Sequence, residues 1–391
     1  MGSESKREYL ETIRARYKNA SKRVKRIILD EFCQVCGYNR KYAIRVLNAH
    51  VQARSIPPTD RRGRPAKYDH TLLQKPLVTL WKAGNLPCGK RLKAMIPLWL
   101  PHYPKPLEDK ARKLLLSMAP ATLDRFLKPL RSGYSKRGLT TTKPGSLLKK
   151  HIPIKTDQWN ECIPGFLEAD TVAHCGSSTA GMYVNTVNMV DLATSWTEQR
   201  AIWGKGESAV IDAATSIEKA LPFPIRGFDC DNGSEFLNWP LYKHYTERKR
   251  PVQYTRSREY HKNDNAHVEG KNWTHVRQYL GYQRFDDPRI VPLLNDLYTN
   301  EWRLLLNCFL PSVKLIEKTR IKSKIIKRHD EPQTPLARVL TSPHVAPNIK
   351  RQLTLLRDQL NPFDLQRTVS AKINRILKLA TGASPRVRKA S

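Results

Sequence analysis

Apolar positions recur with a helical period at both ends of this chain and form short β-prone runs in its middle. Spacings of three and four residues predict helices over residues 4–30 and, in several pieces, over residues 70–130. After Pro153 the pattern changes and predicts strands over residues 166–175, 182–191, 194–203, 224–230 and 251–255. Helices are expected over residues 208–221, 237–248, 266–279, 292–308 and 366–379. Three strands followed by alternating helices and strands are typical of an α/β domain.

A glycine-centred turn interrupts the helical pattern of the N-terminal region. Gly37 is suited to end one helix in a left-handed turn, and Asn39 is suited to cap the next helix. Two short helices around such a turn are typical of a helix-turn-helix, whose second helix presents Arg40, Lys41 and Arg45. We interpret this segment as a DNA-binding domain; the alternative is an ordinary helical hairpin.

Charge is distributed very unevenly along the chain. Its 391 residues include 69 Lys or Arg and 35 Asp or Glu, which gives a formal net charge of +34. Residues 1–150 hold 34 basic and 10 acidic side chains, residues 151–320 hold 20 and 21, and residues 321–391 hold 15 and 4. A near-neutral centre between basic ends indicates a globular domain flanked by polyanion-binding segments, rather than a uniformly solvated basic surface. Nucleic acid is the leading anionic partner.

Composition and motifs argue against several other classes of protein. No run of 18 apolar residues occurs, so no membrane-spanning helix is expected. The first residues lack the apolar segment of a secretory signal, and seven cysteines in a long chain fit reduced thiols. Cys33-x-x-Cys36 lacks a second ligand pair at zinc-site spacing, and the chain has neither a Gly-rich nucleotide loop nor a nucleophilic serine motif.

A basic segment containing several prolines separates the two helical regions. It includes Arg62-Gly63-Arg64-Pro65, which resembles the core of an AT-hook. In that motif glycine allows close approach to the minor groove, proline keeps the chain extended, and the arginines enter the groove. The alternative is a plain basic linker between domains.

Three acidic residues stand in contexts that indicate chemistry. Asp170 lies within the first predicted strand, and Asp231 follows the fourth and begins the run Asp-Asn-Gly-Ser-Glu-Phe. Glu269 lies near the start of the helix expected over residues 266–279. Any one aspartate is usually a turn or cap residue, but this ordered triplet predicts a catalytic site. Glu168 and Glu235 are interpreted instead as packing or solvent-facing residues.

These motifs resemble insertion-sequence transposases with a retroviral-integrase-type catalytic core, the DDE superfamily. The similarity is carried by the Asp-Thr at residue 170, the Asp-Asn-Gly-x-Glu-Phe motif and the run from Lys262 to Arg277. Many relatives have glutamine after the glutamate, whereas this chain has Gly270. The resemblance implies an RNase H-like α/β core with a mixed five-stranded sheet, a bacterial and cytoplasmic protein associated with the nucleoid, and subunits that pair as a homo-oligomer on DNA.

The resemblance also implies how the site residues act. Asp170 would bridge two Mg²⁺ or Mn²⁺ ions, Asp231 would hold one and Glu269 the other. Phosphodiester cleavage benefits from two such ions about 4 Å apart, and hard oxygen ligands favour these metals over zinc. Lys262 in the preceding loop, and Asn272 and Arg277 on the helix, are expected DNA contacts; the alternative is a solvated helix face.

The sequence therefore predicts a multidomain DNA transposase. Its expected parts are a helix-turn-helix domain (1–54), an AT-hook-like linker (55–69), a second helical DNA-binding domain (70–130), a basic linker (131–154), an integrase-like catalytic core (155–320) and a basic C-terminal arm (321–391). It would bind element ends, hydrolyse a phosphodiester to free a 3′-hydroxyl, and join that hydroxyl to target DNA. The alternatives are a non-catalytic DNA-binding regulator with the same core and a structure-selective nuclease.

Overall fold

The computed structural model describes residues 3–49, 68–131, 163–231, 233–257, 266–321 and 324–381. The chain divides into two compact units, Met1–Lys67 and Tyr68–Ser391. No described helix has the length and apolar character needed to cross a membrane. The expected AT-hook residues, most of the two expected linkers and Lys262 lie outside the described residues.

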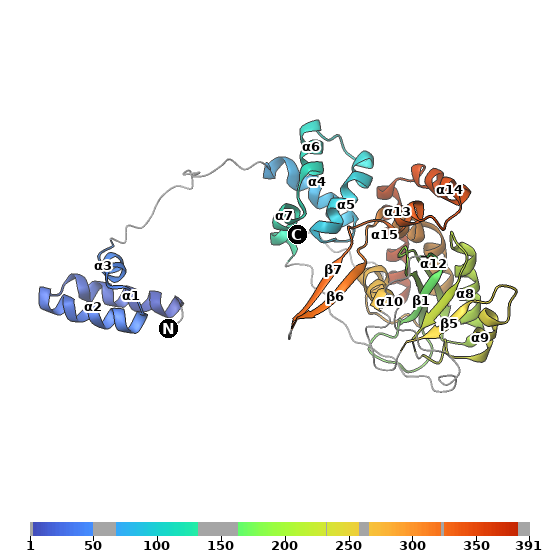
Figure 1. Ribbon diagram of the computed structural model, residues 1–391, viewed down its shortest axis with the longest axis horizontal. Helices are drawn as coiled ribbons and strands as arrows, with labels where there is room; N and C mark the ends of the chain where they lie inside the picture. Colours follow the sequence, from blue (N-terminus) through green and yellow to red (C-terminus); the bar gives the residue numbers. More distant parts are fainter. Residues whose placement is uncertain are drawn as a thin grey trace. The chain divides into compact units, whose positions relative to one another are not determined.

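Three helices make up the described part of the first unit: α1 (Ser3–Lys18), α2 (Lys22–Cys36) and α3 (Arg40–Asn48) (Figure 1). As predicted, α2 ends at Gly37, whose φ of +66° is left-handed and whose N–H donates to the Cys33 carbonyl. The Asn39 side chain accepts a hydrogen bond from the Lys41 N–H and so caps α3. Phe32 and Leu47 are buried where the three helices meet.

The centre of the second unit is a mixed five-stranded sheet with the order β3-β2-β1-β4-β5. Its strands are β1 (Phe166–Ala173), β2 (Val184–Asp191), β3 (Thr197–Trp203), β4 (Gly227–Cys230) and β5 (Gln253–Arg256). The first three strands pair antiparallel, whereas β1, β4 and β5 run parallel. The predicted succession of strands along the chain and the mixed five-stranded sheet are therefore confirmed.

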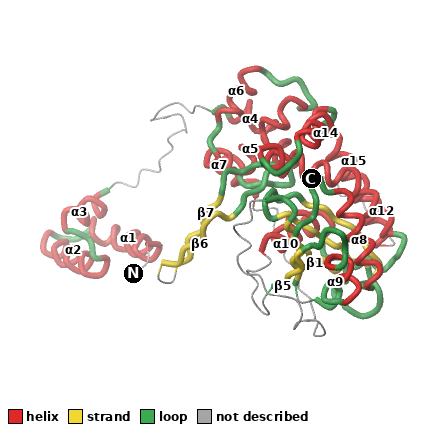
Figure 2. The backbone as a smooth tube through the Cα atoms, turned by 45° about the vertical axis from the view of Figure 1, so that its right-hand side comes forward, coloured by secondary structure: helices red, strands yellow, loops and turns green. Residues whose placement is uncertain are grey.

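Side chains alternate between the two faces of this sheet and so face different helices. On one face Leu167 and Ala169 of β1 pack against α8 (Glu207–Ala220) and α9 (Trp239–Thr246). The other face contacts α10 (Ala266–Lys271) and the π-helical segment η3 (Asn272–Arg277), which α11 (Gln278–Leu280) continues. Figures 1 and 2 both show α10 beside β1. Asp170 lies on the same face of β1 as Glu168, so both side chains point towards α10 and η3.

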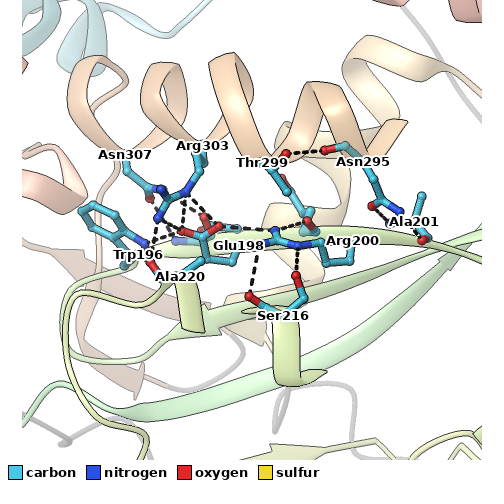
Figure 3. A network of polar contacts seen from close by, with 12 residues as sticks. Trp196, Glu198, Arg200, Ala201, Ser216, Ala220, Asn295, Thr299, Arg303 and Asn307 are labelled. Carbon is cyan, nitrogen blue, oxygen red and sulfur yellow. Dashed lines mark hydrogen bonds and ion pairs between the residues drawn. The ribbon is translucent and has the colours of Figure 1, made fainter. Parts of the chain in front are cut away.

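A long helical segment covers the edge strand β3. It starts as α12 (Ile290–Leu297) and continues through the π-helical segments η4 (Tyr298–Trp302) and η5 (Leu305–Phe309). Asn307 accepts from the Thr197 N–H at 2.9 Å and donates to the Thr197 carbonyl at 2.9 Å. Asn295 makes the same pair of bonds with Ala201, at 2.7 and 2.9 Å (Figure 3). These two amides satisfy backbone groups that an edge strand otherwise exposes.

A buried ion pair fastens the same helix to β3. The Glu198 side chain is fully buried and accepts hydrogen bonds from Arg303 and from the Trp196 indole at 2.8 and 3.0 Å (Figure 3). Arg200, also buried, lies 3.5 Å from the Glu198 carboxylate. Because Glu198 is surrounded by donors, its charge is compensated inside the unit.

The expected second helical domain packs directly onto the core. It comprises α4 (His70–Ala83), α5 (Gly89–Trp99), the short 3₁₀ turn η1 (Leu100–His102), α6 (Asp109–Ser117) and α7 (Pro120–Arg131). The Trp99 indole donates to the Phe309 carbonyl at 2.9 Å, and Arg91 donates to the Pro311 carbonyl at 2.6 Å. Trp99 and Phe309 also belong to one apolar cluster, so this helical region shares a core with the sheet's helical cover.

The segment from residue 321, expected as a basic arm, is largely folded onto the core. A two-stranded ribbon of β6 (Leu315–Ile321) and β7 (Lys324–His329) is followed by α13 (Pro335–Thr341), α14 (Pro347–Asp358) and α15 (Pro362–Thr381) (Figure 1). The expected helix over residues 366–379 lies inside α15. Val369 and Ile376 of α15 are buried in the cluster that contains Leu294 of α12. The apolar stripe allows α15 to pack against the core despite the positive charge of the segment, because the basic side chains occupy the remaining helix surface.

Candidate active site

The two aspartates of the predicted triplet meet where the parallel pairing of β1 with β4 ends. In the β1–β4 pair Ala169 lies opposite Cys230, and Asp170 and Asp231 are the residues that follow these two in sequence. Asp170 is still within β1, whereas Asp231 directly follows β4. Carboxyl ends of parallel strands are the usual place for a site in an open α/β sheet.

Both aspartates have a raised pKa in a largely desolvated position. Burial and the charge of Asp231 raise the pKa of Asp170 to about 8, against hydrogen bonds from Thr171 and Asn272. Burial also raises the pKa of Asp231, and the charge of Glu235 adds to this effect. Like charges held this close favour a shared proton or a bound cation.

Gly233 allows the loop after β4 to close around Asp231. Its N–H donates to Asp231 Oδ1 at 2.9 Å. A β-carbon at this position would lie 2.8 Å from Asp231 Oδ1 and 2.7 Å from Glu235 Oε2. A side chain at position 233 would therefore displace one or both of these carboxylates.

Glu235 is a fourth acid at this site, although its sequence context alone favours packing or solvent. Its side chain is 5% exposed, accepts from Thr171 Oγ1 at 2.7 Å and pairs with Lys205. Burial opposes ionisation of Glu235, but the charge and hydrogen bond of Lys205 outweigh it, and the pKa of Glu235 is lowered. Its position in the Asp-Asn-Gly-x-Glu-Phe motif, next to Asp231, is the signal that could have identified it.

The third acid, Glu269, lies on α10 with its side chain exposed. The helix start is held by Glu168, which is fully buried on β1 and accepts from the Val268 N–H at 2.9 Å. Burial raises the pKa of Glu168, and the nearby charges of Asp229 and Glu269 contribute. Within the described ranges no three Asp, Glu, His or Cys side chains are gathered closely enough to hold a metal ion. The structure thus brings Asp170 and Asp231 together and places Glu269 on the adjacent helix.

Asn272 connects that helix to the aspartates. Its amide donates to Asp170 Oδ2 at 2.5 Å, and its carbonyl oxygen accepts from Asn188 of β2 at 2.7 Å. The sequence pattern favours Asn272 as a DNA contact, but its side chain is engaged inside the protein. Helical spacing predicts that Asn272 shares a face with Glu269, but it does not show that Asn272 contacts β1 and β2.

Arg277, another expected DNA contact, is also used within the fold. Its guanidinium donates to the Ala173 carbonyl at the end of β1 at 2.7 Å. It also lies over the Tyr282 ring, 4.8 Å from the ring centroid. Arg277 therefore fastens η3 to the strand that carries Asp170.

The expected DNA contacts of the first unit lie at its surface. Arg40, Lys41 and Arg45 are all exposed on α3. Arg40 pairs with Asp30 of α2, and Arg45 lies over the Tyr42 ring at 5.0 Å. Arg62, Arg64 and Lys262 fall outside the described residues, so their expected contacts with DNA stay predictions.

The donor set at the two strand ends fits a hard divalent cation. Asp170 and Asp231 offer carboxylate oxygens whose mutual repulsion a cation would relieve. Oxygen ligands of this kind suit Mg²⁺ or Mn²⁺. Lys205 pairs with Glu235, yet the charge of Glu235 still contributes to the raised pKa of both aspartates.

Comparison with known proteins gives one substantial sequence match. No family model matches the chain. It is 39% identical over 338 residues to the uncharacterized protein y4rM of Sinorhizobium fredii, covering 85% of this chain and 94% of that protein. Among solved structures, an intasome of simian T-cell lymphotropic virus in complex with the PP2A regulatory subunit B56 gamma is similar at 13% identity and a TM-score of 0.30. That similarity covers 50% of this chain and 63% of the other, which is less than two thirds of its length.

Proposed function

The chain belongs to the same family as the rhizobial protein y4rM, and we propose that it is a DNA transposase with an integrase-like, RNase H-like catalytic core. One observation carries the proposal: Asp170 and Asp231 meet at the ends of parallel strands, and the helix bearing Glu269 is bonded to Asp170 through Asn272. Each of the three acids belongs to one of the three motifs that resemble the DDE superfamily. The mixed five-stranded sheet is also the kind of sheet that this resemblance implies.

The reaction is phosphodiester hydrolysis followed by strand joining. Water attacks one phosphodiester and leaves a 3′-hydroxyl; that hydroxyl then attacks a phosphorus atom in target DNA, and the 3′-oxygen of the target strand leaves. Asp170, Asp231 and Glu269 would hold Mg²⁺ or Mn²⁺ ions, which activate an attacking oxygen and stabilise a leaving one. The exposed Glu269 carboxylate would have to turn towards the aspartates when they bind a cation.

The protein's own groups prepare this site. Asn272 orients the Asp170 carboxylate, and the Gly233 N–H fixes one oxygen of Asp231. Lys205 keeps Glu235 ionised beside them. On α3 the exposed Arg40, Lys41 and Arg45 would bind the phosphates of the element ends, and two or more subunits would pair those ends. A cytoplasmic, nucleoid-associated location in a bacterium is part of the same proposal.

The test is a strand-transfer assay on DNA taken from the sequence that flanks the coding region. With Mg²⁺ the protein should give nicked ends and joined strands, and Asp231→Asn should give neither while still binding the ends. Joined products from Asp231→Asn would contradict the assignment of the site. Hydrolysed ends without joining would favour a structure-selective nuclease, and DNA binding without any cleavage would favour a regulator.

A further inference from the structure

A cavity lies on the side of α10 and η3 that faces away from Glu269 and Asn272. It has a volume of about 290 Å³ and is bounded by α10 and η3, α5, the end of β2 and the β6–β7 ribbon. Its polar lining includes Arg91, Lys271, Thr274, His275, Lys327 and His329. Gly270 also lines it, and a β-carbon there would meet no atom within 4 Å. None of these residues takes part in the aspartate site.

The charges that line this cavity are all of one sign. Arg91, Lys271 and Lys327 come from three different elements, and no described residue that lines the cavity carries a carboxylate. Burial lowers the pKa of Arg91. Burial also lowers the pKa of His275, and the neighbouring charges of Lys271 and Arg91 lower it further. Cations gathered in a partly desolvated space are costly unless an anion enters to compensate them.

An unsatisfied buried nitrogen on a residue that lines this cavity gives a second, independent indication of a ligand. The His275 side chain is 4% exposed, and its Nδ1 has no hydrogen-bond partner among the described residues. Buried polar atoms in folded proteins are paired in the large majority of cases. An oxyanion in the cavity would accept a hydrogen bond from His275 and from the surrounding cations at the same time.

We propose that this cavity binds a phosphate group, carried either by a free nucleotide or by a strand of DNA. Its volume is at the lower end of the range for ligand pockets, about 300 Å³ and above, which suits a phosphate with at most one nucleoside. Arginine, lysine and imidazole donors are the groups that recognise phosphate oxygens. The proposal does not depend on catalysis by the aspartates, because it uses different side chains.

Neighbouring positions of the β6–β7 ribbon offer a matched pair of variants. Lys327, Arg328 and His329 are all exposed, but only Lys327 and His329 line the cavity, because Arg328 between them points to the opposite face of the strand. Lys327→Gln and Arg328→Gln therefore remove the same charge from adjacent residues. Lys271→Gln tests the helix side of the cavity, and it replaces a basic side chain beside Arg91 rather than a packed apolar side chain.

Calorimetric titration of the full chain, without divalent cations, would measure binding of inorganic phosphate, deoxyadenosine monophosphate and a short 5′-phosphorylated DNA strand. Lys271→Gln and Lys327→Gln should each raise the Kd for phosphate at least tenfold, and Arg328→Gln should change it less than twofold.

Competition between the DNA strand and inorganic phosphate would identify a DNA phosphate as the ligand. Binding of the mononucleotide without competition by DNA would identify a free nucleotide. Equal losses in Lys327→Gln and Arg328→Gln, or no binding of any probe, would overturn the proposal. Because no metal is present in the titration, its failure would not bear on the aspartate site, and the two proposals stay distinguishable.

Discussion

Replacing Asn307 by alanine removes both hydrogen bonds through which the long helix satisfies the backbone of Thr197 in the edge strand β3. Asn307 is fully buried, and its amide holds the Thr197 N–H and carbonyl at 2.9 Å each. Alanine supplies neither a donor nor an acceptor. The Thr197 groups would then be left unpaired beneath η5, since Thr197 is itself fully buried.

The size of the effect follows from the number of groups left unpaired. A buried backbone donor or acceptor without a partner costs about 1–3 kcal/mol. Two such groups therefore destabilise the contact between β3 and the helix by about 2–6 kcal/mol. Since each 1.4 kcal/mol is tenfold in an equilibrium constant, local opening of β3 should increase roughly 30- to 20,000-fold.

Hydrogen–deuterium exchange followed by mass spectrometry measures this opening directly. Peptides that contain Thr197 should exchange faster in Asn307→Ala by about the same factor. The matched control is Asn300→Ala on the same helix, because Asn300 is exposed and bonds to Asp296 of its own helix rather than to β3. Equal exchange of Thr197 in Asn307→Ala and the wild type would refute the assignment of Asn307 as the partner of the edge strand.

Three further predictions concern the aspartate site and DNA binding. Asn272→Ala should lower the rate of strand cleavage at saturating DNA about tenfold or more, because Asp170 loses its amide donor. The affinity for DNA should not change. A wild-type cleavage rate would contradict a positioning role for Asn272. Gly233→Ala should reduce cleavage similarly, since its β-carbon would lie 2.8 Å from Asp231 Oδ1, and unchanged single-turnover kinetics would argue against that contact. Raising salt from about 50 to about 200 mM should weaken DNA binding on the order of 100-fold or more in fluorescence anisotropy, because phosphate contacts release counterions; a salt-independent Kd would contradict binding by basic residues.

The positions of strands and helices in the second unit follow closely from local sequence pattern. The pattern predicts a strand over residues 166–175 and a helix over 208–221, and the structure has β1 at Phe166–Ala173 and α8 at Glu207–Ala220. The turn at Gly37 and the cap at Asn39 are equally predictable, because each depends on residues adjacent in the chain. Local sterics and side-chain period decide such features.

Roles that depend on a distant partner are harder to predict. Local context assigns Glu235 to packing or solvent because its partner Lys205 is 30 residues away, and nothing nearby in the chain indicates that pair. Helical spacing favours Asn272 as a DNA contact, because it shows which residues share a helix face but not which strands cover that face. Net charge predicts an arm after residue 321, whereas the apolar stripe of α15 folds that segment onto the core.

The sequence by itself determined the succession of the five strands along the chain, the identity of the acids in their motifs and the concentration of positive charge at both ends of the chain. Only the tertiary structure decided that Asp170 and Asp231 meet while Glu269 remains exposed on the next helix. The tertiary structure also decided that three cations from separate elements surround one cavity. The physical reason is range: periodicity and turn chemistry act over a few residues, whereas desolvation and charge pairing act between whichever surfaces the folded chain brings together.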